Sequence, residues 1–83
     1  MKAYIIRQAD EQQDIMAVFV DRRAARHSWV YDYAGYMVNW EDWEPVKEML
    51  RAFHQAEQPN ARYRADGYGE YSGVQIDIME VDE

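Results

Sequence analysis

Two apolar stretches near the N-terminus predict a pair of strands. Residues 2–7 (KAYIIR) are rich in β-forming side chains, and residues 15–20 (IMAVFV) are continuously apolar, which is typical of a buried strand. The residues between them, 8–14, are polar and suit a connection. We therefore expect the two strands to pair antiparallel, with the second one buried.

The next segment, residues 22–37, carries two competing patterns. Apolar side chains recur at spacings that place them on one face of a helix. These side chains belong to Ala25, Trp29, Tyr33, Tyr36 and Met37. Asp21 is suited to cap the start of this helix and Gly35 to end it. Because Trp, Val and Tyr also favour strands, a strand at Trp29–Tyr33 is the alternative to the helix that we expect.

Residues 43–57 hold the clearest helical pattern. Their apolar side chains fill one arc at about 100° per residue. They are Val46, Met49, Leu50 and Phe53, with Trp43 at the edge of the arc. Asp42 is placed to be the N-cap, Pro45 is tolerated in the first turn, and residues 58–60 (QPN) end the helix.

The C-terminal part predicts two more strands joined by a turn. Residues 61–65 suit a short strand, and Asp66-Gly67 with residues 69–73 supply turn chemistry. Residues 74–79 alternate between apolar and polar, which predicts a strand buried on one face. The last three residues, 81–83, form an acidic tail.

These elements predict a single α+β domain over residues 1–83. We expect a small antiparallel sheet of three to five strands with one or two helices packed on one face. A chain of this length buries only about 60–65% of its unfolded surface, so its core is thin.

Charge and aromatic residues are unevenly distributed. The formal net charge is −7, and residues 27–83 contain twelve carboxylates and only four cations. All three Trp and six of the seven Tyr lie in this acidic part. Such a charge favours solubility and steers a protein toward basic partners.

The motifs for catalysis and metal binding are weak, so we expect no enzyme, cofactor or metal. The chain has no Cys, and its two histidines, His27 and His54, lack the partners of a catalytic triad. Asp66-Gly67 resembles the middle of a calcium-binding loop, with Asp66 at the fifth position. Arg62 and Arg64 then occupy the first and third positions, where carboxylates must bind the cation. Gly-Tyr-Gly at residues 67–69 departs from the dinucleotide fingerprint, because a serine replaces its third glycine.

A small basic cluster interrupts the acidic character. Arg22, Arg23 and Arg26 do not make the broad basic surface that nucleic-acid binding needs. We expect these arginines to pair with the protein's own carboxylates or with those of another copy.

The acidic residues interleaved with aromatic ones form the candidate binding surface. A small core cannot bury so many rings, and exposed Trp and Tyr side chains anchor interfaces. The expected contacts are Glu41, Asp42, Glu44, Glu48, Asp66, Tyr68, Glu70 and Tyr71. Carboxylates around aromatic anchors suit a partner surface rich in Arg and Lys, on a protein or nucleoprotein complex, and do not suit nucleic acid itself or a membrane.

This profile resembles that of the small phage-encoded inhibitors that include the anti-CRISPR proteins. The resemblance is of size and composition across the whole chain: short, acidic, free of Cys and α+β. It implies a non-enzymatic inhibitor that docks on a nucleic-acid-handling partner by phosphate mimicry and blocks DNA or RNA binding. It also implies a cytoplasmic protein of a bacterial host cell. The alternative is a structural or regulatory module, antitoxin-like or a dimerising subunit, whose aromatic residues form the interface.

Overall fold

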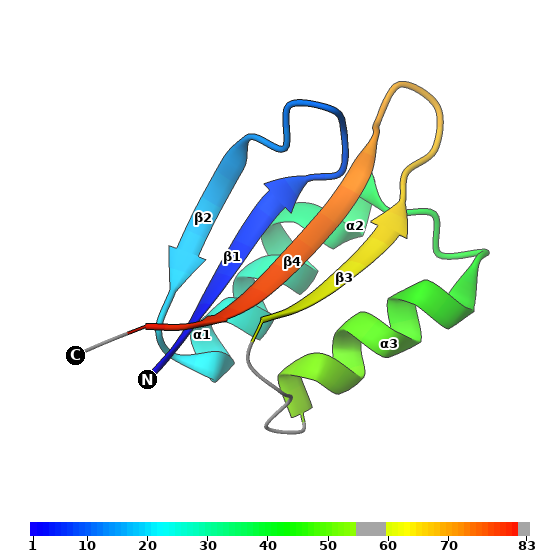
Figure 1. Cartoon of the computed structure of the whole chain (residues 1–83). Helices are drawn as coiled ribbons and strands as arrows, with labels where there is room; N and C mark the ends of the chain where they lie inside the picture. Colours follow the sequence, from blue (N-terminus) through cyan, green and yellow to red (C-terminus); the bar gives the residue numbers. More distant parts are fainter. Residues whose placement is uncertain (55–59, 82–83) are drawn as a thin grey trace.

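Four antiparallel strands and a set of helices make up the fold (Figure 1). The computed structural model describes residues 1–54 and 60–81. Strand β1 (Lys2–Gln8) pairs with β2 (Ile15–Phe19) and with β4 (Gly73–Glu80), and β3 (Ala61–Asp66) pairs with β4. The sheet order is therefore β2-β1-β4-β3. The predicted α+β class, the strand count and the N-terminal antiparallel pair are confirmed.

Helices cover one face of the sheet, and the core lies between the two layers. The segments α1 (Arg22–Ser28), η1 (Trp29–Ala34, a π-helix) and α2 (Gly35–Met37) follow one another, and α3 (Trp43–His54) packs beside β3. The core side chains from the sheet alternate along their strands, as expected for a sheet with one face on the core. The largest of the fully buried residues are Trp29, Phe53, Ile6, Met49, Ile76 and Ile78.

The predicted helix over residues 22–37 is confirmed, and the alternative strand at Trp29–Tyr33 is wrong. Asp21 caps the helix as predicted, because its carboxylate accepts a hydrogen bond from the Ala24 N–H at 3.1 Å. Gly35 does not end the helix; its φ of −58° is helical, and the chain becomes extended at Val38.

A π-helical turn changes which side chains of this segment are buried. From Trp29 the next fully buried residue is Ala34, five positions on, because a π-helix bonds i to i+5. Tyr36, expected on the buried face, is consequently 46% exposed, and Tyr33 is only partly buried.

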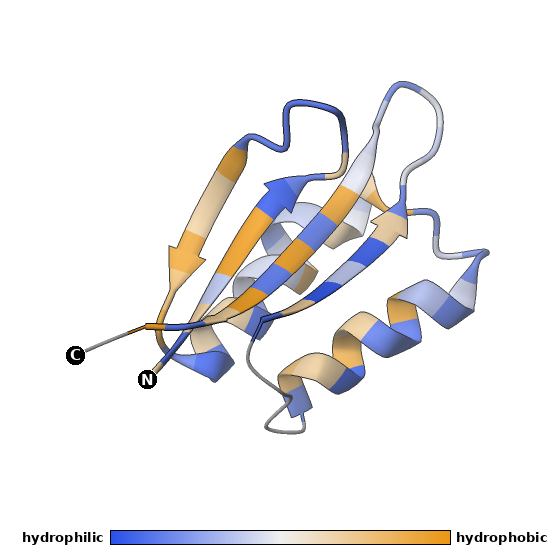
Figure 2. Ribbon diagram, viewed as in Figure 1, coloured by the Kyte–Doolittle hydropathy of each residue, from blue (hydrophilic) through white to orange (hydrophobic). Residues whose placement is uncertain are grey.

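Strand β2 lies where the sequence predicts, but the expectation that it is buried is wrong. It is an edge strand, and Ile15 and Val18 are each 56% exposed. Figure 2 shows this apolar strand at the rim of the sheet, with no strand on its outer side. A continuous apolar run indicates a strand without showing whether that strand has one neighbour or two.

The helix that we expected over residues 43–57 begins at Trp43, directly after Asp42. It buries Val46, Met49 and Phe53, as the pattern predicts. The helix is described to His54. Of the predicted end at Glu57 and the stop at residues 58–60, only Asn60 lies within the described residues, and its φ is +66°. The acidic tail likewise lies outside them beyond Val81.

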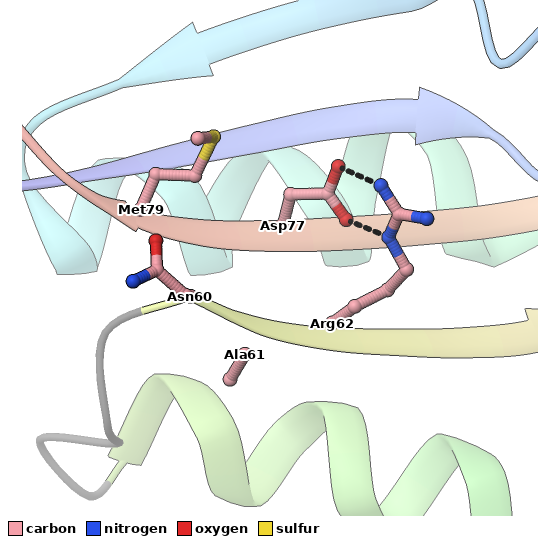
Figure 3. A pocket seen from close by; sticks show the side chains of 5 residues that line it. All are labelled: Asn60, Ala61, Arg62, Asp77 and Met79. Carbon is pink, nitrogen blue, oxygen red and sulfur yellow. Dashed lines mark hydrogen bonds and ion pairs between the residues drawn. The ribbon is translucent and has the colours of Figure 1, made fainter.

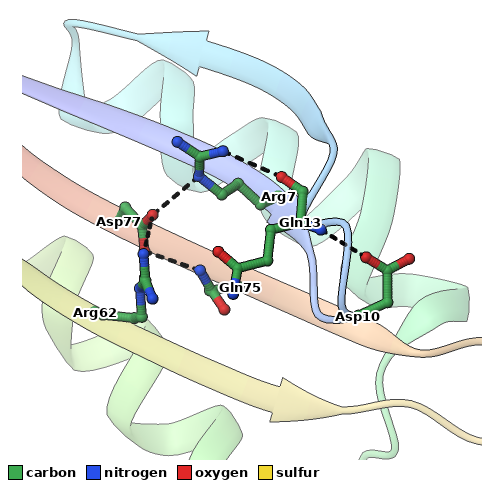
Figure 4. Close-up of polar contacts among 6 residues, drawn as sticks. All are labelled: Arg7, Asp10, Gln13, Arg62, Gln75 and Asp77. Carbon is green, nitrogen blue, oxygen red and sulfur yellow. Dashed lines mark hydrogen bonds and ion pairs between the residues drawn. The ribbon is translucent and has the colours of Figure 1, made fainter.

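The face of β4 turned away from the helices is also covered. Val74, Ile76 and Ile78 are buried as predicted, but Gln75 and Asp77 on the opposite face are buried too, at 2% and 5% exposure. Arginines from the flanking strands lie across them and bind the Asp77 carboxylate (Figure 4). Asp77 is therefore part of the fold, and not of the solvent-exposed acidic set.

Candidate functional site

Two connections meet at one end of the sheet and form the candidate site. One is the segment 38–42 between α2 and α3, and the other is the β3–β4 loop, residues 67–72 (Figure 1). The backbone N–H of Asn39 donates to the Asp66 carbonyl at 2.8 Å and ties the two connections together. Residues far apart in the sequence thus come to share one surface.

Glycines set the shape of the β3–β4 loop. Gly69 and Gly73 have φ of +60° and +102°, as the turn chemistry predicts. Gly67 is required for a different reason, because a Cβ there would overlap the backbone of Tyr71. The tight loop leaves Tyr68 and Tyr71 exposed at 49% and 38%.

Between the two connections lies a shallow groove of about 400 Å³. Its lining consists of Val38, Asn39, Trp40, Glu41 and Tyr68. The lining combines an apolar side chain, Val38, and two aromatic rings with one carboxylate, that of Glu41. A flat or elongated cationic side chain fits this combination, since its stem packs on rings while its charge meets Glu41.

Exposed aromatic rings extend from the groove in two directions. Tyr71 contacts both Tyr68 and Tyr36, with ring centroids 6.1 and 5.7 Å apart. On the other side Trp40 and Trp43 lie 6.0 Å apart and are 38% and 48% exposed. We call the five residues Tyr36, Trp40, Trp43, Tyr68 and Tyr71 the aromatic surface.

Trp40 is held in a fixed orientation. Its indole N–H donates to the Ala34 carbonyl at 2.7 Å, and its ring contacts the buried Trp29 ring at a centroid distance of 6.3 Å. Asn39 shapes the turn that follows, accepting from the backbone N–H of Glu41 and of Asp42. A ring fixed in this way loses little conformational entropy on binding.

The predicted carboxylates surround the aromatic surface and are all exposed: Glu41, Asp42, Glu44, Glu48, Asp66 and Glu70. Glu41 lines the groove, Asp66 is the last residue of β3, and Glu70 lies in the β3–β4 loop. Asp66 has a long contact with Arg64, 3.8 Å between Oδ1 and Nε. Glu48 is more remote, because it lies one helical turn beyond Glu44.

Of the eight residues chosen from the sequence, the structure places Glu41, Tyr68 and Tyr71 together, and it adds three neighbouring rings. Tyr68 and Glu41 line one groove, and Tyr71 contacts Tyr68, as described above. The prediction omitted Tyr36 from this surface, because α-helical spacing placed it in the core, and it also omitted Trp40 and Trp43 from the contacts. The interleaving of the two Trp with acidic residues was the available signal; the π-helical turn that exposes Tyr36 gives no recognisable sequence pattern.

Other hollows on the surface lack such a combination. A small one of about 180 Å³ at the end of β3 and β4 is lined by Asn60, Ala61, Arg62, Asp77 and Met79 (Figure 3). Its two charged groups neutralise each other, since Arg62 Nε donates to Asp77 at 2.8 Å. This hollow accordingly presents no unpaired charge to a ligand.

The two histidines make different contacts. His27 is exposed and its ring contacts that of Tyr31 at 4.6 Å, whereas the His54 carbonyl accepts a hydrogen bond from Arg22. Within residues 1–54 and 60–81, no three side chains of His, Asp or Glu gather as metal ligands do, and no helix is long and apolar enough to cross a bilayer.

Comparison with known proteins adds no family to this description. No protein-family model matches the chain, and no curated protein or solved structure matches it significantly.

Proposed function

We propose that the protein is a non-enzymatic binding protein whose aromatic surface and surrounding carboxylates dock on a basic, nucleic-acid-handling partner. The partner's Arg or Lys side chains, which otherwise hold phosphates, bind the carboxylates instead. DNA or RNA is thereby excluded by competition. In this proposal the protein acts in the cytoplasm of a bacterial host, as an inhibitor of the kind that its composition resembles.

One observation carries the proposal: five exposed aromatic side chains lie together at a groove whose lining includes the Glu41 carboxylate. A contiguous exposed apolar patch on a folded protein commonly marks an interaction site. Tyr and Trp are enriched among the side chains that dominate binding energies. Arg stacks on such rings and also pairs with carboxylates through its planar guanidinium.

The test is a titration with a single-site cationic probe. We would follow the fluorescence of the exposed Trp40 and Trp43 while adding a short peptide with two Arg residues, and repeat it with Gln in place of Arg. The proposal predicts saturable binding of the Arg peptide alone, weakening as salt rises because the attraction is electrostatic.

Variants separate a localised site from diffuse attraction to an acidic protein. Glu41→Lys with Glu44→Lys reverses charge at the groove-lining Glu41 and in the first turn of α3, and we call this pair the groove variant. Glu11→Lys with Asp14→Lys makes the same change in charge on the β1–β2 connection. The first pair is expected to reduce affinity for the peptide at least tenfold, and the second to change it less than twofold. Equal losses from both pairs would show that net charge alone attracts the peptide, and would contradict the proposal.

A second pair of variants tests the contribution of the aromatic rings to peptide binding. Tyr68→Ala removes a ring of the groove, whereas Tyr31→Ala removes a ring that is 71% exposed and lies outside the groove. We expect Tyr68→Ala to cost about 1–2 kcal/mol of binding, as truncation of an interface Tyr commonly does. Tyr31→Ala should leave affinity unchanged; if both variants bind like the wild type, the rings are not anchors.

A further inference from the structure

Strand β2 is a short edge strand with an apolar sequence. Its five residues include no charge and no proline, which are the usual devices that keep a sheet edge from pairing with another chain. One protecting feature is present, a bulge in β2 itself: Ile6 and Arg7 of β1 pair with Ala17 and Ile15, which leaves Met16 as the extra residue. Among the described residues no strand lies beyond β2.

This edge is held in position before any partner arrives. Residues of β1 pair with it from Tyr4 to Arg7, and the Tyr33 hydroxyl donates to the Met16 carbonyl at 3.2 Å. The apolar side chains Ile15 and Val18 stand on it 56% exposed, and Val20 just beyond it is 62% exposed. A fixed strand with an unpaired backbone edge is a template for a further strand.

Charges of opposite sign lie at the two ends of β2. Before the strand are three carboxylates, Asp10, Glu11 and Asp14. After it come Arg22, Arg23 and Arg26, with one carboxylate, Asp21, that caps α1. We expected these arginines to pair with carboxylates, but within the described residues none of the three forms an ion pair. They also line a hollow of about 220 Å³ with Phe53 and His54.

We infer that β2 pairs antiparallel with β2 of a second copy, around a two-fold axis near Ala17, to give an eight-stranded sheet. Antiparallel pairing of identical strands sets the acidic end of each copy against the basic end of the other, so both ends are satisfied at once. A two-fold interface is self-complementary in this way. The aromatic surface does not fit a second copy, because its carboxylates would meet one another.

The sheet order places this seam away from the aromatic surface. Strand β2 is one edge of the sheet, while the β3–β4 loop and α3 lie at the other side (Figure 1). The proposed dimer therefore leaves both copies of the aromatic surface free. The inference goes beyond the proposed function and does not depend on it.

The experiment is sedimentation equilibrium of the whole chain over a wide range of concentration, with folding checked by circular dichroism. The expected result is a reversible dimer, twice the chain mass of 9.9 kDa. Val18→Lys, on an exposed position, is expected to raise the dimer dissociation constant at least tenfold, because a lysine on the edge opposes strand pairing. The groove variant Glu41→Lys with Glu44→Lys should leave it unchanged.

A charge exchange tests the antiparallel arrangement itself. Arg22→Glu with Arg23→Glu makes both ends acidic, and Glu11→Lys with Asp14→Lys makes both ends basic. Each double variant alone should dimerise at least tenfold more weakly, and an equal mixture should recover dimers because both contacts are then complementary. A wild type that stays monomeric, a dimer insensitive to Val18→Lys, or a mixture without recovery would overturn the inference.

Discussion

At the scale of single residues, the Asp77 carboxylate binds side chains of neighbouring strands on the sheet face turned away from the helices. It accepts hydrogen bonds from Arg7 Nε at 2.9 Å, Arg62 Nε at 2.8 Å and Gln75 Nε2 at 3.1 Å (Figure 4). The hydrogen bond from Arg62 to Asp77, together with the charge of Asp77, raises the pKa of Arg62. Three strands are joined through this one side chain.

We predict that Asp77→Asn destabilises the fold by about 1–3 kcal/mol, because charged hydrogen bonds at a buried position are lost. Arg62→Gln is the control and should cost less, since Arg62 is largely exposed while Arg7 still holds the carboxylate. Urea unfolding monitored by circular dichroism measures both. An Asp77→Asn protein as stable as the wild type would contradict this role.

The pH dependence of the pair follows from the raised pKa of Arg62. A raised pKa means that the contribution is fully present at neutral pH and is lost as the pH rises through the raised value. The pair itself therefore gives no change in stability between about pH 6 and pH 9, which urea unfolding of Arg62→Gln and wild type across that range checks. A difference between the two proteins that varies with pH in this window would contradict it.

At the scale of elements, the π-helical turn of η1 decides which rings reach the surface. It moves the buried position from Tyr33 to Ala34 and leaves Tyr36 free to contact Tyr71. The same turn presents the Ala34 carbonyl to the Trp40 indole. The aromatic surface thus depends on the phase of one helical segment.

Substitutions on the two alternative faces test that phase. Ala34→Leu is expected to destabilise the protein by about 1–3 kcal/mol, because extra methylene groups enter a filled core. Tyr36→Leu should cost less than about 1 kcal/mol, as only a surface ring contact is lost. Thermal unfolding distinguishes them; a larger loss for Tyr36→Leu would mean that the helix keeps α-helical phase.

The bounds of the helices and strands were predictable from the sequence, whereas the burial of particular side chains and the order of the strands were less so. Strand positions follow from β-forming residues and turn glycines, and β4 was placed within a residue at each end because its apolar residues alternate. The burial of Asp77 was not predictable, because it depends on arginines brought by two other strands. The edge position of β2 also could not be predicted, since strand order is a property of the whole sheet. The exposure of the carboxylates chosen for the candidate site was predictable, because charged side chains are mostly exposed, and Asp77 is the exception.

At the scale of the whole molecule, two different surfaces lie toward opposite edges of one sheet, the aromatic surface near β3 and the apolar strand β2 at the other edge. The aromatic surface carries exposed rings among carboxylates, and β2 offers an apolar edge between charges of opposite sign. The net charge of −7 makes long-range attraction to a basic partner favourable and sensitive to salt. A dimer through β2 would present two binding surfaces to such a partner.

The most direct test of the proposed function is capture of a partner by the immobilised protein from nuclease-treated bacterial lysate at low and high salt. Wild type, the groove variant Glu41→Lys with Glu44→Lys, and the control Glu11→Lys with Asp14→Lys are compared side by side by mass spectrometry. We predict a nucleic-acid-handling protein that wild type and control retain at low salt, that the groove variant loses, and that added DNA or RNA displaces. A partner bound equally by all three proteins and indifferent to nucleic acid would contradict the account.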